Sequence, residues 1–182
     1  MAKPNMEPKP VRVSITDIRI MIAVGICVLT STLLNHFGIK LSYGEMKLEI
    51  IQKITAAISC LLVTQDGMGA SKGAGIVRIK VTVMAGIAAL VIVLIDTAIG
   101  NEWVSVLLVM VGLVLTLVLC KAVKAPYMNC RIGGVNFIIM SCTLTANARL
   151  AYTGMRIVST IYGVLVVLLV TWIFEKFSNK DK

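Results

Sequence analysis

The sequence predicts an all-α polytopic membrane protein with six transmembrane helices, and composition and charge distribution are the first two reasons. Of the 182 residues, 58% are apolar and only 15% are charged, a balance unlike that of a soluble domain with a polar surface. The charged residues are grouped in short clusters between long apolar runs. The chain is therefore predicted to consist of repeated spanning segments, with almost no room for a folded soluble domain.

Six apolar runs are the third reason, since each is long enough, or nearly so, to cross a bilayer. They cover about residues 18–37, 50–65, 80–95, 102–120, 133–147 and 157–174. The first, third, fourth and sixth runs are dense in Val, Leu and Ile, whereas the second and fifth are short and interrupted by polar groups. We expect the second and fifth helices to have the least regular boundaries.

The distribution of Lys and Arg predicts the orientation of these helices. With the N-terminus inside, the inner segments hold 13 of the 18 Lys and Arg residues and the outer segments hold 5. Because positive residues accumulate on the cytoplasmic side, both termini are predicted to be cytoplasmic. The expected organisation is a cytoplasmic tail over residues 1–16, a six-helix membrane domain over 17–175 and a second cytoplasmic tail over 176–182.

A weak internal repeat relates the segments around two arginines. One copy holds Arg78, Thr82, Ala85 and Gly86, and the other holds Arg156, Thr160 and Gly163. Each copy follows one of the interrupted helices, which implies two units of three helices in opposite orientation, the inverted-repeat arrangement of many secondary transporters. The other interpretation is a chance likeness between short apolar helices with a basic start.

Polar and ionisable groups are concentrated on and beside the two interrupted helices. Short, broken helices at equivalent places in two halves are the best pointer to a transport site, and a charge in hydrocarbon tends to line a cavity or to find a partner. The predicted substrate-binding or pathway residues are Gln65, Asp66, Arg78, Asn136, Asn147, Arg149 and Arg156. The competing interpretation is structural: residues at helix ends cap backbone groups, and arginines at the start of apolar runs fix helix depth.

The remaining motifs predict neither an enzyme nor a bound cofactor. The glycine-rich stretch 67–75 lacks the Gly-Lys-Ser/Thr ending of a P-loop, and we expect it to form a flexible or partly helical turn whose small residues let backbones approach closely. No Ser-His-Asp set, paired carboxylates or metal-ligand spacing can be assembled. The net charge of +9 is assigned to topology and to contact with anionic lipid, and not to nucleic acid.

Residues 54–65, followed by Gly69-Ala70-Ser71, Gly75, Arg78, Thr82 and Gly86, and later by Arg156, Thr160 and Gly163, carry a family resemblance. Over about residues 17–174 the chain resembles the aromatic acid exporter and fusaric acid resistance-like (FUSC) membrane proteins of bacteria, and is similar to one membrane module of that family. Asp66 is a departure, because family members often have proline there, and this puts the expected kink in doubt.

The resemblance implies a bacterial inner-membrane protein that exports small organic, aromatic acids. No nucleotide site is found, so an ion gradient would drive transport, and self-association as a homo-oligomer would complete a pathway. A second class of function stays open, a non-transporting membrane scaffold or assembly subunit. The expected partners are membrane lipid, a small organic anion and further copies of the chain.

Overall fold

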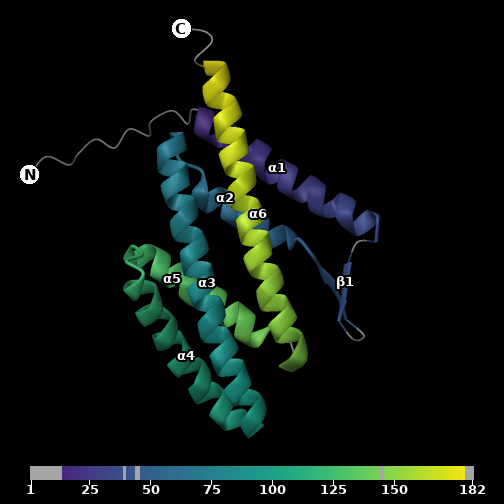
Figure 1. Cartoon of the computed structure of the whole chain (residues 1–182), viewed down its shortest axis with the longest axis vertical. Coiled ribbons are helices and arrows are strands. Elements are labelled where there is room, and N and C mark those ends of the chain that lie inside the picture. The colour runs from purple at the N-terminus through teal and green to yellow at the C-terminus, as the bar shows by residue number, and fades with distance from the viewer. Residues whose placement is uncertain (1–13, 39, 44–45, 144–145, 179–182) are drawn as a thin grey trace, which may run out of the picture.

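The structure, a computed structural model, describes residues 14–38, 40–43, 46–143 and 146–178, and within these it is predominantly helical (Figure 1). The helices are α1 (Ile15–His36), α2 (Lys53–Val63), α3 (Met68–Ile99), α4 (Glu102–Ala122), α5 (Tyr127–Cys142) and α6 (Ala146–Ser178). The sequence analysis did not predict the hairpin of β1 (Lys40–Tyr43) and β2 (Met46–Glu49), which pair antiparallel with Lys40 opposite Glu49. The hairpin joins α1 to α2.

Helix length separates these elements into two groups. Four helical segments are long and apolar enough to cross a membrane: Ile15–His36, Met68–Ile99, Trp103–Ala122 and Ala151–Phe177. The 11 residues of α2 and the 16 of α5 extend only about 16 Å and about 24 Å, less than the ~30 Å hydrocarbon core of a bilayer. Helices therefore occur at all six predicted places, but only four of them have the length for a crossing.

Local chemistry sets several of the helix ends. Ser14 and Asp17 form a capping box at the start of α1, which satisfies backbone N–H groups that have no partner within the helix. Gly100 ends α3 with a φ of +64°, a left-handed conformation that glycine adopts without steric cost. Asn101 then accepts a hydrogen bond from the backbone N of Trp103 at 3.1 Å and begins α4. The tight turn between α3 and α4 is thus encoded locally.

The two longest helices, α3 and α6, form the centre of the molecule and run antiparallel (Figure 1). The short helices pack against the long helix of the other half, α2 against α6 and α5 against α3. The outer helices follow the same rule: α1 lies on α2 and α6, and α4 lies on α5 and α3. Close approach at Gly163 seats α2 on α6, since an added Cβ would lie 2.7 Å from the carbonyl oxygen of Ala56.

Polar contacts join the ends of α3 and α6. At one end, Glu175 near the end of α6 accepts a hydrogen bond from the backbone N of Met68, the first residue of α3, at 2.7 Å. At the other, Arg149 near the start of α6 donates to Asp96 near the end of α3 at 2.8 Å. Asp96 is thus half-buried and ion-paired. In both places an acid from the end of one long helix contacts the start of the other.

The glycine-rich stretch 67–75 was expected to form a flexible or partly helical turn in which small residues let backbones approach closely. The close approach is found at only some of its residues. Its residues form the first turns of α3, which begins at Met68. Gly75 packs tightly, since an added Cβ would lie 2.6 Å from Val164 Cγ1, whereas nothing lies within 4 Å of a Cβ at Gly69 or Gly73. Packing against α2 and α6 extends the helix through residues that form helices poorly by themselves.

The extension of α3 and α6 corrects the expected position of the two arginines. Arg78 and Arg156 do not stand at the start of their helices; each comes ten residues after the first one, from 68 to 78 and from 146 to 156. A side chain so deep in a helix that is packed on several sides has no direct route to the interface. This depth argues against helix anchoring, which was the competing interpretation of the two arginines from the sequence.

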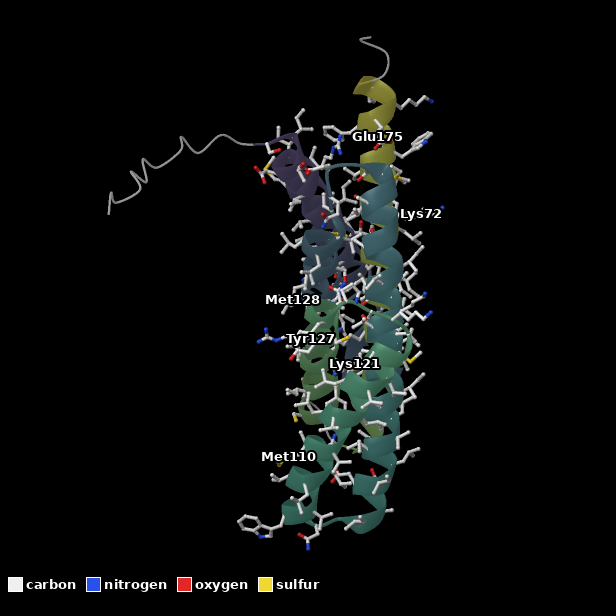
Figure 2. All side chains as sticks on the ribbon, turned by 90° about the vertical axis from the view of Figure 1, so that its left-hand side faces the viewer. Lys72, Met110, Lys121, Tyr127, Met128 and Glu175 are labelled. Atoms are coloured by element: carbon white, nitrogen blue, oxygen red, sulfur yellow. The ribbon has the colours of Figure 1, made fainter. Side chains whose placement is uncertain are left out.

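The outer surface of the molecule is largely apolar. Turned by 90°, it is a narrow slab from which side chains such as Met110 and Tyr127 project (Figure 2). The outward face of α4 carries Val106, Leu107, Met110, Val111, Val114 and Val118, all more than half exposed. Apolar faces of this extent in a helical protein fit contact with lipid.

Candidate functional site

A cluster of buried polar side chains lies where α3, α5 and α6 meet. Arg78 of α3, Asn136 of α5 and Arg156 of α6 are 6%, 2% and 4% exposed. All three were predicted from the sequence as site residues. Burial of this degree is rare for arginine, so the cluster is the strongest candidate for a functional site in the described part of the chain.

Hydrogen bonds connect the cluster from α6 to α3. Arg156 Nη2 donates to Asn136 Oδ1 at 3.3 Å, and Asn136 Nδ2 donates to Thr82 Oγ1 at 3.3 Å. Thr82 Oγ1 donates in turn to the carbonyl oxygen of Arg78 at 2.9 Å. Arg156 Nη1 donates to the hydroxyl of Tyr152 at 3.2 Å. Every partner of the Arg156 guanidinium in this network is a neutral group.

Three guanidinium nitrogens of the two arginines have no hydrogen-bond partner in the described part of the chain. They are Arg156 Nε and Arg78 Nε and Nη1. The described ion pairs join Lys53 to Glu49 and Arg149 to Asp96, so neither central arginine is matched by a described carboxylate. Burying an unmatched charge costs several kcal/mol. The cluster is therefore a cationic site that an anion would stabilise.

A cavity of about 580 Å³ opens beside Arg156, between α2, α5 and α6. Its volume lies within the usual range for a small-molecule pocket. Arg156 and Tyr152 form one part of the wall, and Ile54, Ile58 and Ile139 form an apolar part. The other lining residues are Glu49, Gln52, Lys53 and Thr55. A cationic head beside apolar walls suits a small molecule with an anionic group and a hydrocarbon body.

Gln65 and Asp66, also predicted as site residues, lie away from this cluster. Both are exposed in the connection between α2 and α3. The Asp66 carboxylate accepts from Thr16 Oγ1 at 2.7 Å, and its carbonyl oxygen accepts from Arg19 Nη1 at 3.3 Å. Gln65 is held through its backbone N, which donates to Ser71 Oγ at 3.0 Å. These contacts fasten the connection to α1 and α3, and the structural interpretation accounts for them.

Arg149 and Asn147 lie near the start of α6, beyond the cluster. Arg149 contacts Asp96 and lines a second, mainly apolar cavity of about 360 Å³ with Ser105 and Ser141. Asn147 belongs to the first turn of α6, and its side chain lies outside the described residues. The structure thus brings together three of the seven predicted residues, Arg78, Asn136 and Arg156.

Tyr152 and the apolar wall of the pocket were not predicted from the sequence as parts of the site. Tyr152 comes four residues before Arg156, the spacing at which side chains on one helix face meet, so that partner could have been found. The wall could not, because Ile54, Ile58 and Ile139 come from helices whose packing no local pattern predicts.

The described residues contain no group of three or more His, Cys, Asp or Glu that could hold a metal ion. The fold and the site together define a helical membrane protein with a cationic, partly open pocket in its interior. No protein-family model, no curated protein and no solved structure matches the chain.

Proposed function

We propose that the protein exports small organic anions, aromatic carboxylates among them, across a membrane. The observation that carries this proposal is the pair of buried arginines without a matching carboxylate, beside a pocket with apolar walls. An anion bound there would neutralise charge that the described protein leaves unmatched, and the isoleucines would contact its hydrocarbon part. An ion gradient is the proposed source of energy.

The proposal includes six membrane spans built as two inverted units of three helices. The exchange of α1 with α4, α2 with α5 and α3 with α6 leaves the pattern of helix packing unchanged, which supports the repeat. In both copies the threonine hydroxyl donates to the arginine carbonyl four residues earlier, at 2.9 Å: Thr82 to Arg78 and Thr160 to Arg156. Such bonds are common in helices, so the packing is the stronger support.

The positions of the connections support six crossings. In Figure 1 the start of α1, the α2–α3 connection, the α4–α5 turn and the end of α6 lie toward the upper left. The hairpin, the α3–α4 turn and the end of α5 lie toward the lower right. Ends that alternate between two sides are what six passes through a bilayer require, with the bilayer thinned around the short helices α2 and α5 and with α3 and α6 tilted. With the upper-left side inside, both termini are cytoplasmic.

Reporter fusions test this topology. A fluorescent reporter that matures only in the cytoplasm should be bright after Lys124 and after Lys176, and dark after Gly100. A periplasmic phosphatase reporter should give the opposite result at the same three positions. Activity of the phosphatase after Lys124 would overturn the six-span topology, because it would mean that α2 or α4 does not cross.

A flux assay tests the transport function. We expect purified protein in liposomes to move radiolabelled aromatic carboxylates down an imposed gradient, and Arg156→Gln to lower the initial rate at least about tenfold, as loss of a charged hydrogen-bond partner predicts. Arg131→Gln, on the exposed face of α5, is the matched control and should transport normally. Absence of wild-type flux across a broad panel of acids would overturn the proposal.

The scaffold alternative makes a different prediction for the same residues. A scaffold would use Arg78 and Arg156 for assembly, so alanine at either position would change oligomer size and leave solute movement unaffected. Both side chains face the interior, which favours a ligand-binding role over contact with another protein. The apolar outer face of α4 supports lipid contact and self-association in either case.

The proposed relatives are the bacterial aromatic acid exporter and fusaric acid resistance-like proteins, with the bacterial inner membrane as the location. Support comes from the residues that carried the resemblance. Arg78, Thr82, Arg156 and Gly163 all lie in the buried centre of the molecule. Residues shared with a family for functional or packing reasons would be expected there.

A further inference from the structure

We infer that the ligand of the central cluster carries two negative charges, one for each arginine, so that the preferred ligand is a dicarboxylate. The inference deepens the proposed function and rests on it. Three observations carry it: the charge balance of the site, the division of its free donors between two helices, and the neutral residue between the arginines.

The charge balance is +2 among the described residues of the cluster. Arginine stays protonated in proteins, and Arg78 and Arg156 are both more than nine-tenths buried. The two charges are close enough to repel each other. Glu49 and Lys53 line the adjoining pocket, but they pair with each other at 3.9 Å and add no net charge. A monocarboxylate would neutralise only half of the buried charge.

The free donors occur in two groups. Arg156 Nη1 and Nη2 each donate one hydrogen bond, to Tyr152 and Asn136, and Nε of Arg156 on α6 has no described partner. On α3, Nε and Nη1 of Arg78 have no described partner. The two arginines lie in the same stretch of the α3–α6 crossing, because Gly75 meets Val164 on one side of them and Gly86 meets Thr153 on the other. Two carboxylates on one small skeleton match donors that are divided between two packed helices.

The residue between the arginines is an amide. Asn136 contacts Arg156 directly and reaches α3 through Thr82, and it supplies no charge. An aspartate of the same size at this position would provide one of the two negative charges from within the protein. Asn136→Asp should therefore change the charge that the ligand must carry from two to one.

Calorimetric binding to the full chain in lipid nanodiscs tests the inference. The probes are benzoate, its three dicarboxylate analogues phthalate, isophthalate and terephthalate, and inorganic phosphate. We expect at least one dicarboxylate to bind about tenfold more tightly than benzoate, roughly the effect of one added charge-assisted contact. Asn136→Asp should reverse this order, Arg78→Gln should abolish the difference, and Arg131→Gln should preserve it. Size-exclusion profiles and circular dichroism confirm that each variant is folded.

The possible results separate the inference from the proposed function. Equal affinity of the wild type for benzoate and all three dicarboxylates would overturn the two-charge inference and leave the proposed function intact. Tight binding of phosphate together with weak dicarboxylates would overturn the assignment of two separate carboxylates. If no carboxylate binds, both fail. A reversed preference in Asn136→Asp is the result that a merely structural role for Asn136 would not produce.

Discussion

Arg78 and Arg156 occupy equivalent positions in α3 and α6, yet their surroundings differ. Arg156 donates to Asn136 and Tyr152 and borders an open pocket. Arg78 is equally buried, but its Nε and Nη1 have no partner in the described part of the chain. Two arginines at similar positions in two long helices therefore have different electrostatic surroundings.

The difference can be traced to two positions. The residues 78 places before Tyr152 and Asn136 are Ala74 and Ile58, which carry no polar group for Arg78. Similar positions in two helices thus do not give two arginines the same binding properties. The partners on the neighbouring turn and on the packed helix decide what an arginine can bind. Four sets of variants test the helix packing and the difference between the surroundings of Arg78 and Arg156.

The largest effect is expected where the backbone of α2 packs on α6. Gly163→Leu should lower the free energy of unfolding by about 3 kcal/mol, because the new side chain would meet the backbone of α2, which cannot move aside cheaply. Gly154→Leu is the matched control on the same helix, since nothing lies within 4 Å of a Cβ there. Thermal unfolding in detergent measures both. Equal stability of the two variants would mean that α2 does not pack on α6.

Removing each arginine charge should have opposite effects. Arg78→Met should raise stability by about 2 kcal/mol, because it removes a buried charge without a described partner and keeps the apolar stem. Arg156→Met should lower stability by about 1 to 2 kcal/mol, because leaving Asn136 Oδ1 and the Tyr152 hydroxyl without their donor costs more than is gained by removing a charge that these two groups already solvate. Urea or thermal unfolding in the absence of ligand measures the two changes. A change of the same sign in both variants would contradict the difference between the two sites.

The hydrogen bond between Tyr152 and Arg156 can be removed, and a tyrosine at the same spacing can be introduced before Arg78. Tyr152→Phe should cost about 1.5 kcal/mol, the lower end of the net range for a hydrogen bond to a charged group. Ala74→Tyr places a phenol four residues before Arg78 and should be more stable than its control Ala74→Phe by a similar amount. If tyrosine at 74 is no better than phenylalanine, the isolation of Arg78 has another cause.

The smallest effect is expected at the end of the helix pair. The Asp96–Arg149 ion pair is partly exposed, with side chains 18% and 22% accessible, so Arg149→Gln should cost only about 0.5 kcal/mol, and less at high salt. It should leave ligand binding within about twofold of the wild type. Unfolding at low and high salt checks the first statement and calorimetry the second. A tenfold loss of binding would place Arg149 in the site, as the sequence first indicated.

Much of the helical framework could be predicted because its signals are local. Long apolar runs identified α1, α3, α4 and α6, and polar interruption identified α2 and α5 as short. The hairpin was missed because residues 40–49 carry no turn motif of the Asn-Gly or Asp-Gly kind. The starts of α3 and α6 were placed too late, because the segments before Arg78 and Arg156 are polar or glycine-rich and become helical only through contact with other helices.

The candidate site was predicted in part, for a related reason. Charge in an apolar segment is visible in the sequence, and this was enough to single out Arg78 and Arg156. Whether a charged side chain lies at the hydrated membrane interface or in the protein interior depends on how many helices surround it. Asp66 and Arg149 satisfied the same sequence criterion as the two central arginines, and the structure places them in contacts at the ends of the helices.

The sequence by itself determined that this is a helical membrane protein, that its second and fifth helices are short, and that two arginines lie in its apolar segments, because hydrophobic length and charge are properties of the chain itself. Only the tertiary structure decided that α3 and α6 cross with both arginines buried between them and that Asn136 lies beside Arg156. It also decided that Arg78 faces no described partner. Those features depend on the packing of helices distant in sequence, which close approaches such as Gly163 on Ala56 make possible.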